Sequence, residues 1–261
     1  MANFIMPRTT CHESDTLSSD ELTNTPRKKP FTGAIHLNTL WCLPCFRDAV
    51  REWMGDEVWA LQIDCYIVNA PSKACDPCKA FDQKCDLIPQ GIRGHVFELM
   101  ALITFVEKYW MDCIEQWQDD DNPEAEWPGD FIKQLSSAVK SLCAAFDDLV
   151  ETHRKAHLLI GNVSDEAKAG YSAWCNAREH TICPSTHRSD KLHLQYAFRA
   201  TEYLRLRMGE EGSVHWAMSI WSFYQTVRTS VGCYVKTKNT YFTRSHIDYI
   251  EKEFPLEAPE F

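Results

Sequence analysis

From residue 94 onward, apolar residues recur at three- and four-residue spacing, a pattern typical of helices that bury one face. This pattern predicts helices over residues 95–117, 130–160, 164–182 and 189–208, a fifth helix that begins at Ser213, and a short sixth over 246–254. Ser164 is placed to cap the third helix, and Gly161 fits a helix stop before it. Short connections between the helices predict a five- or six-helix bundle over residues 91–261.

Residues 34–90 follow a different pattern. A short helix is predicted over residues 46–53, and residues 59–67 alternate between apolar and polar side chains, which predicts a β-strand. Residues 1–33 are poor in apolar side chains and predict a disordered leader, whose basic group at 26–30 we interpret as part of a solvated tail, with a nuclear-import or phosphate-contact patch as the alternative. The expected fold class is therefore mainly α: a small cysteine-rich zinc module over residues 34–90, followed by a helical domain over 91–261.

Composition narrows the class of protein. Apolar residues make up 44% of the 261 residues and charged residues 25%, which excludes a collagen-like or globally disordered chain. The net charge is −10, from 27 basic and 37 acidic residues. We find neither an apolar run long enough to span a membrane nor the apolar centre of a signal peptide. A nuclear or cytoplasmic protein without a membrane partner is expected.

The cysteines carry the strongest chemical signal. Six of the twelve lie between residues 42 and 85, and disulfides are rare in an intracellular protein, so clustered thiols point to metal. Two Cys-x-Pro-Cys turns stand among them, and zinc takes four thiolates in a tetrahedron. Three interpretations stay open: two zinc ions on all six thiols, one zinc on the two pairs alone, or reduced or redox-active thiols without metal. The candidate metal ligands are Cys42, Cys45, Cys65, Cys75, Cys78 and Cys85.

After these residues, a resemblance becomes visible. The segment Cys75-Asp76-Pro77-Cys78-Lys79-Ala80-Phe81-Asp82-Gln83-Lys84-Cys85 has the C-x2-C-x6-C spacing of the fungal-type Zn2Cys6 binuclear zinc-cluster family, and the cysteine-rich segment as a whole resembles that family. The resemblance implies that Cys42 and Cys75 bridge two zinc ions, that Cys45 and Cys65 complete one site, and that Cys78 and Cys85 complete the other. It also implies a regulatory protein that binds DNA or chromatin.

The chain departs from the family's pattern in three ways. The 19 residues between Cys45 and Cys65 are more than the family has at that place, and they include only Arg47 and Arg51 as basic residues, against five acidic ones. The Lys-Cys-Asp ending at Cys85 usually closes the family's first half, not its second. Since DNA affinity draws on neutralised phosphates, two hypotheses remain: a zinc-cluster regulatory protein bound to DNA or chromatin, slightly favoured, and a zinc-stabilised interaction or scaffold protein without DNA binding.

Weaker candidates lie in the helical region. His153 and His157 share a helix face at a spacing that can hold metal, but we interpret them as a surface or interface pair. Core and capping roles are expected for Cys175, His180, Cys183 and His187. No catalytic motif is found and closed thiolate sets suit structural zinc, so we expect no enzyme and infer no small-molecule substrate. A solvated surface is expected for the interleaved basic and aromatic residues, with nucleic acid as the alternative: Tyr203, Arg205, Arg207, Tyr234, Lys236, Lys238, Tyr241 and Arg244.

Overall fold

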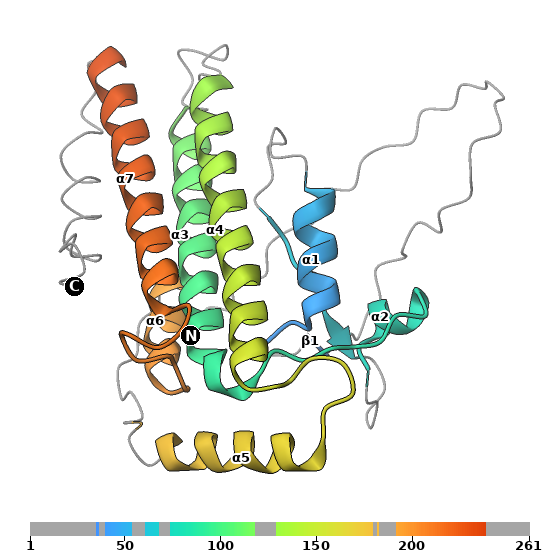
Figure 1. Cartoon of the computed structure of the whole chain (residues 1–261). Coiled ribbons are helices and arrows are strands. Elements are labelled where there is room, and N and C mark those ends of the chain that lie inside the picture. The colour runs from blue at the N-terminus through green and yellow to red at the C-terminus, as the bar shows by residue number, and fades with distance from the viewer. Residues whose placement is uncertain are drawn as a thin grey trace, which may run out of the picture. The chain divides into compact units, whose positions relative to one another are not determined.

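The protein is seen here in a computed structural model that describes residues 35–36, 40–53, 61–67, 74–117, 129–179, 182 and 192–238. All of them belong to one compact unit, residues 34–261 (Figure 1). The elements described are β1 (Ile35–His36), α1 (Leu43–Glu52), β2 (Tyr66–Ile67), α2 (Asp76–Ala80), the 3₁₀ turn η1 (Gln90–Ile92), α3 (Arg93–Trp117), α4 (Gly129–Ala156), α5 (Asp165–Glu179), α6 (Leu192–Thr201) and α7 (Ser213–Lys238).

The long helices form a bundle, which confirms the predicted mainly α class. Helix α6 packs against α3, α7 packs against α4, and α3 also meets α4. The apolar stripe predicted for α4 is its buried face, and it comprises Leu135, Val139, Leu142, Phe146, Leu149 and Val150. Among the described residues, no helix is both long enough and apolar enough to cross a membrane.

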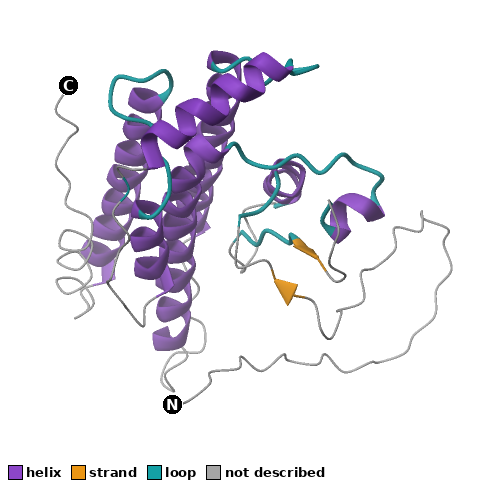
Figure 2. Ribbon diagram, turned by 90° about the horizontal axis from the view of Figure 1, so that it is seen from below, coloured by secondary structure: helices purple, strands orange, loops and turns teal. Residues whose placement is uncertain are grey.

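The cysteine-rich segment lies beside the bundle and shares its core. Figures 1 and 2 show α1, α2 and the strands to one side of the long helices. One continuous apolar cluster contains Trp41 and Phe46 of this segment together with Leu142 and Phe146 of α4. The apolar side chains of this segment therefore pack into the same core as those of the bundle.

The predicted strand over residues 59–67 is largely wrong. Only Tyr66–Ile67 forms a strand, which pairs antiparallel with Ile35–His36, and residues 61–65 have no regular structure. The alternation nevertheless predicts burial, since Leu61 and Cys65 are buried while Gln62 and Asp64 are exposed. The side chains of residues 61–67 alternate as in a strand. Within the described residues, however, only Tyr66 and Ile67 pair with another strand.

Several helix ends differ from the sequence predictions. Helix α1 begins at Leu43, three residues early, because Pro44 suits the first turn of a helix. Helix α4 ends at Ala156 rather than near residue 160. Just after this end, Leu158 adopts a positive φ of 55°, and the amide of Leu159 donates a hydrogen bond to the carbonyl of Arg154. Ser164 caps α5 as predicted, its hydroxyl accepting a hydrogen bond from the amide of Ala167.

Helix α6 also ends early, at Thr201 instead of 208. The residues that follow bond to α3 rather than continuing their own helix: the amide of Gly94 donates to the carbonyl of Leu204, and the amide of Leu206 donates to Nε2 of His95. These tertiary hydrogen bonds replace the helical ones, which local propensity alone does not reveal. The predicted helix over 246–254 and the predicted leader over 1–33 lie outside the described residues.

Candidate metal centre

Two matching turns present the cysteine pairs. Cys42 is the N-cap of α1 and Cys75 is the N-cap of α2, both with extended backbone (φ −83°, ψ 158° and φ −68°, ψ 157°). In each turn the proline follows two residues later, and the second cysteine, Cys45 or Cys78, completes the first helical turn. A helix start holds the two thiols of a pair on one side of the backbone, so each turn offers both sulfurs in the same direction.

The two pairs face each other. The Sγ of Cys42 lies 3.7 Å from that of Cys75 and 3.4 Å from that of Cys78, while Cys45 Sγ lies 3.5 Å from Cys75 Sγ and 3.9 Å from Cys78 Sγ. Four sulfurs at Zn–S distances of about 2.3 Å in a tetrahedron are separated by about 3.8 Å. These spacings therefore suit metal coordination, and they are too long for disulfides, in agreement with the free thiols of the described cysteines.

The remaining two cysteines of the segment join the same cluster. The sulfurs of Cys42, Cys45, Cys65 and Cys75 all lie within 4.8 Å of one another, as do those of Cys42, Cys75, Cys78 and Cys85. The two sets of four share Cys42 and Cys75. All six candidate ligands are thus gathered in one place, in two groups that could each hold a metal ion.

The two shared cysteines are deeply buried. Cys42 and Cys75 are 1% and 2% exposed, whereas Cys85 is half-buried at the edge. The backbone amide of Cys42 points at Cys65 Sγ, 3.4 Å away, and so favours a thiolate there. Within the described residues, no aspartate, glutamate or histidine belongs to either set, so each set consists of four sulfurs.

Without a cation this cluster resists ionisation. Burial is the largest influence on Cys78 and Cys85, and it raises the pKa of the Cys85 thiol to about 11 and that of Cys78 further still. Hydrogen bonds from Cys45 and Cys65 act the other way on Cys42 and lower its pKa. Divalent cations would oppose the effect of burial at Cys78 and Cys85, because they displace the thiol protons and neutralise the sulfurs.

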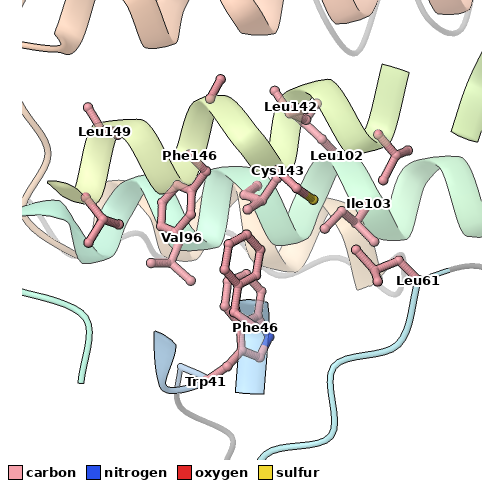
Figure 3. Packing of buried hydrophobic residues seen from close by; sticks show 14 of the residues in the cluster. Trp41, Phe46, Leu61, Val96, Leu102, Ile103, Leu142, Cys143, Phe146 and Leu149 are labelled. Atoms are coloured by element: carbon pink, nitrogen blue, oxygen red, sulfur yellow. The ribbon is translucent and has the colours of Figure 1, made fainter. Parts of the chain in front are cut away.

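Aromatic packing fixes the cluster to the bundle. Trp41, next to Cys42, stacks on Phe46 with ring centroids 5.4 Å apart, and both rings meet Phe146 of α4 edge to face. Figure 3 shows Trp41, just before α1, and Phe46 of α1 pointing toward the helices that carry Phe146, Cys143 and Val96. Phe146 in turn packs edge to face against the buried Trp216 of α7.

Charged contacts reinforce this packing. Arg47 of α1 donates from Nε to Asp147 (2.8 Å) and from Nη2 to Glu151 (2.6 Å), both on α4. Arg154, at the end of α4, donates to Asp86, the residue after Cys85 (2.7 Å). These pairs leave no signal in the sequence, because their members stand 68 to 104 positions apart.

His153 and His157 lie at an interface between α4 and α5. His153 is fully buried, its Nε2 is 3.0 Å from the hydroxyl of Tyr171, and both imidazole rings pack against Tyr171 and Trp174. Burial, followed by the nearby His157, lowers the pKa of His153 to about 3. In the described part of the chain, no further ligand joins the pair to form a metal-binding group. The interface interpretation therefore fits the pair, although His153 is not on the surface.

The other weak candidates are placed only in part. Cys175 is buried in α5, as expected for a core residue. His180, Cys183 and His187 lie outside the described residues, as do the side chains of the basic and aromatic positions from 234 to 244. Tyr203, Arg205 and Arg207 lie in the loop after α6, beside the start of α3. No family model, curated protein or solved structure matches this chain.

Proposed function

We propose that the six cysteines bind two zinc ions, with Cys42 and Cys75 bridging them. The observation that carries this proposal is the position of Cys65 and Cys85. The two Cys-x-Pro-Cys turns alone would serve a single ion, and then Cys65 and Cys85 would have no reason to approach them. Each instead joins the two shared sulfurs in a set of four. The two sets match the ligand sets that the resemblance to Zn2Cys6 clusters implies.

The zinc ions in this proposal are structural. A catalytic zinc keeps one position open to water, whereas both sets here are complete with four sulfurs. The cluster joins the starts of α1 and α2 to the segment around Cys65, where little regular structure holds the chain. Metal binding therefore contributes directly to the folding free energy of this segment.

We further propose that the protein is a zinc-stabilised regulatory protein that acts through protein contacts rather than DNA. Arg47 and Arg51 are the only basic residues between Cys45 and Cys65, and both are already paired, Arg47 with Asp147 and Glu151, and Arg51 with Asp48. Phosphate contacts would have to break these pairs in a chain of net charge −10. Complementary charge favours partners with a basic surface.

Zinc content tests the metal proposal. The full chain, purified without chelator, should hold two zinc ions per chain by elemental analysis. Cys65→Ala and Cys85→Ala should each lower the content, because each variant removes a ligand from one set of four. Cys143→Ala is the matched control, since Cys143 is equally buried but lies in α4 away from both sets. One zinc per chain that survives both variants would contradict the two-ion proposal, and no zinc would contradict metal binding.

DNA titration separates the two functional classes. Fluorescence anisotropy at low salt measures the binding of the natural chain and of Cys75→Ala to mixed-sequence duplex DNA. We expect no DNA binding that depends on the intact cysteine cluster. Salt-sensitive binding by the zinc-loaded chain that is lost in Cys75→Ala would overturn the protein-contact proposal in favour of a DNA-bound regulator. Sedimentation of the same sample reports whether the partner is a second copy of the chain.

A further inference from the structure

A second candidate site is a pocket formed by helical-domain residues that lie far from the cysteine cluster in sequence. A pocket of about 360 Å³ opens between the first turn of α3, the last turn of α5 with Ile182, and the loop after α6. Three of its lining residues are arginines, Arg178, Arg205 and Arg207, and no lining residue is acidic. A cationic cavity is unexpected in a chain of net charge −10, and its volume is within the range of small-molecule sites.

The loop that carries two of the arginines is held in place by α3. Leu204 accepts a hydrogen bond from the amide of Gly94, and Leu206 donates its amide to Nε2 of His95. The Nδ1 of His95 lies 2.9 Å from Glu98, which also accepts a hydrogen bond from Nε1 of Trp216. A site on a fixed backbone loses little conformational entropy when a ligand binds, so these bonds preorganise the loop.

The three guanidinium groups differ in what they already bind. Arg178 forms a bidentate pair with Glu210 and stacks on Trp174, 4.0 Å from the ring centroid. Its guanidinium is therefore already engaged, and the residue forms part of the pocket lining. Arg205 Nη1 lies 3.8 Å from Oε1 of Glu98, a long ion pair without a hydrogen bond, while Oε2 of the same carboxylate binds His95 and Trp216.

Arg207 completes the positive charge. Its backbone amide bonds to Glu210, but within the described residues no carboxylate contacts its exposed guanidinium. Within the described residues, neither the Arg205 nor the Arg207 guanidinium donates a hydrogen bond to a carboxylate, so both of these lining residues keep donors for a ligand. Among the other lining residues, Ile182, Leu204 and Leu206 are apolar, while His95, Thr201 and Tyr203 carry polar groups.

We propose that this pocket binds a small organic phosphomonoester, with the phosphate between Arg205 and Arg207 and the organic part against Leu204, Leu206 and Tyr203. Two guanidinium forks can each take two oxygens of a tetrahedral phosphate, while a carboxylate has only two oxygens to share. The dianion also supplies the charge that balances two arginines without hydrogen-bonded carboxylates. The site is independent of the metal proposal, because none of its residues lies in the cysteine-rich segment.

Calorimetric titration of the full metal-loaded chain tests the proposal with phenyl phosphate, inorganic phosphate and benzoate at constant ionic strength. We expect saturable binding of phenyl phosphate, weaker binding of inorganic phosphate, and little binding of benzoate. Arg205→Gln and Arg207→Gln should each weaken phenyl phosphate binding roughly tenfold or more. Arg51→Gln is the matched control, because it removes an exposed arginine of α1 and should leave the affinity unchanged.

Arg205→Lys guards against misfolding, since it keeps the charge and the side-chain stem that contacts Gly94. It should fold and bind with an intermediate loss, because it lacks the planar fork. Absence of saturable phenyl phosphate binding up to roughly 10 mM would overturn the proposal, as would equal weakening by Arg51→Gln. Benzoate binding as tight as phenyl phosphate binding would overturn the ligand class, and binding of single-stranded nucleic acid without phenyl phosphate binding would overturn the small-molecule assignment.

Discussion

The Nη1 of Arg154 lies 2.7 Å from Oδ2 of Asp86, and this ion pair ties the end of α4 to the residue that follows Cys85. The guanidinium is mostly buried and also reaches the carbonyl of Leu87. Leu43 donates its amide to the carbonyl of Asp86, which links the same point to the start of α1. The half-buried edge of the cysteine cluster is thus held by the bundle.

Loss of this pair should loosen the cluster. Arg154→Gln is expected to lower the free energy of unfolding by about 1–2 kcal/mol, because it leaves a partly buried carboxylate without its cation. Zinc transfer to a chelator should also become faster. Lys168→Gln, which breaks the exposed pair with Asp165, is the control and should change neither quantity measurably. Equal zinc-release rates in the two variants would contradict the coupling.

Metal removal should also weaken the packing of the cysteine-rich segment against the bundle. If zinc is extracted, the turns at Cys42 and Cys75 lose their cross-link, and Trp41 and Phe46 lose the backbone that presses them onto Phe146. We expect the near-ultraviolet circular dichroism of these rings to weaken and the melting temperature to fall, while most of the far-ultraviolet helical signal persists. An unchanged melting temperature after complete extraction would show that the cluster does not brace the fold.

The sequence predicted the chemistry of the cluster better than its surroundings. The Cys-x-Pro-Cys turns identify thiols that converge, because proline and a helix start fix their direction locally. The alternation around Leu61 and Cys65 predicted which side chains are buried, but a strand also needs a partner, which is a tertiary property. For the same reason the early end of α6 could not be foreseen, since it depends on Gly94 bonding to Leu204.

Acid should destabilise the protein through His153. The pKa of His153 in the folded state is about 3, well below the ordinary value near 6.5. Between these two pH values the imidazole is protonated in the unfolded chain and neutral in the folded chain. The stabilisation is fully present above pH 6.5 and is lost as the pH falls toward 3. Between pH 7.5 and pH 5 this group should account for about 1–2 kcal/mol of lost stability.

Denaturant titration of His153→Gln at both pH values measures that contribution. The variant should lose less stability on acidification than the natural chain, since glutamine does not titrate. Acid release of metal affects both proteins alike and cancels in the comparison. His215→Gln, at an exposed position of α7, should keep the natural pH dependence. Identical pH dependence in His153→Gln and the natural chain would refute the assignment.

Two glycines offer a matched pair of opposite sign. A Cβ at Gly94 would lie 2.8 Å from the carbonyl oxygen of Ala200 and 2.9 Å from that of Leu204, so Gly94→Ala should destabilise the protein by about 1–3 kcal/mol. A Cβ at Gly170 meets nothing within 4 Å, and alanine is the better helix former, so Gly170→Ala should stabilise α5 by about 0.5–1 kcal/mol. Changes in melting temperature of the same sign in both variants, relative to the natural chain, would contradict this packing.

The central claim is that two zinc ions share Cys42 and Cys75 within one six-sulfur cluster. Zinc K-edge X-ray absorption on the full chain tests it most directly, because it reports both the ligands and any neighbouring metal. We expect four sulfur neighbours per zinc at about 2.3 Å and a second zinc at about 3 Å. A shell that contains nitrogen or oxygen, or a sulfur shell with no neighbouring zinc, would contradict it.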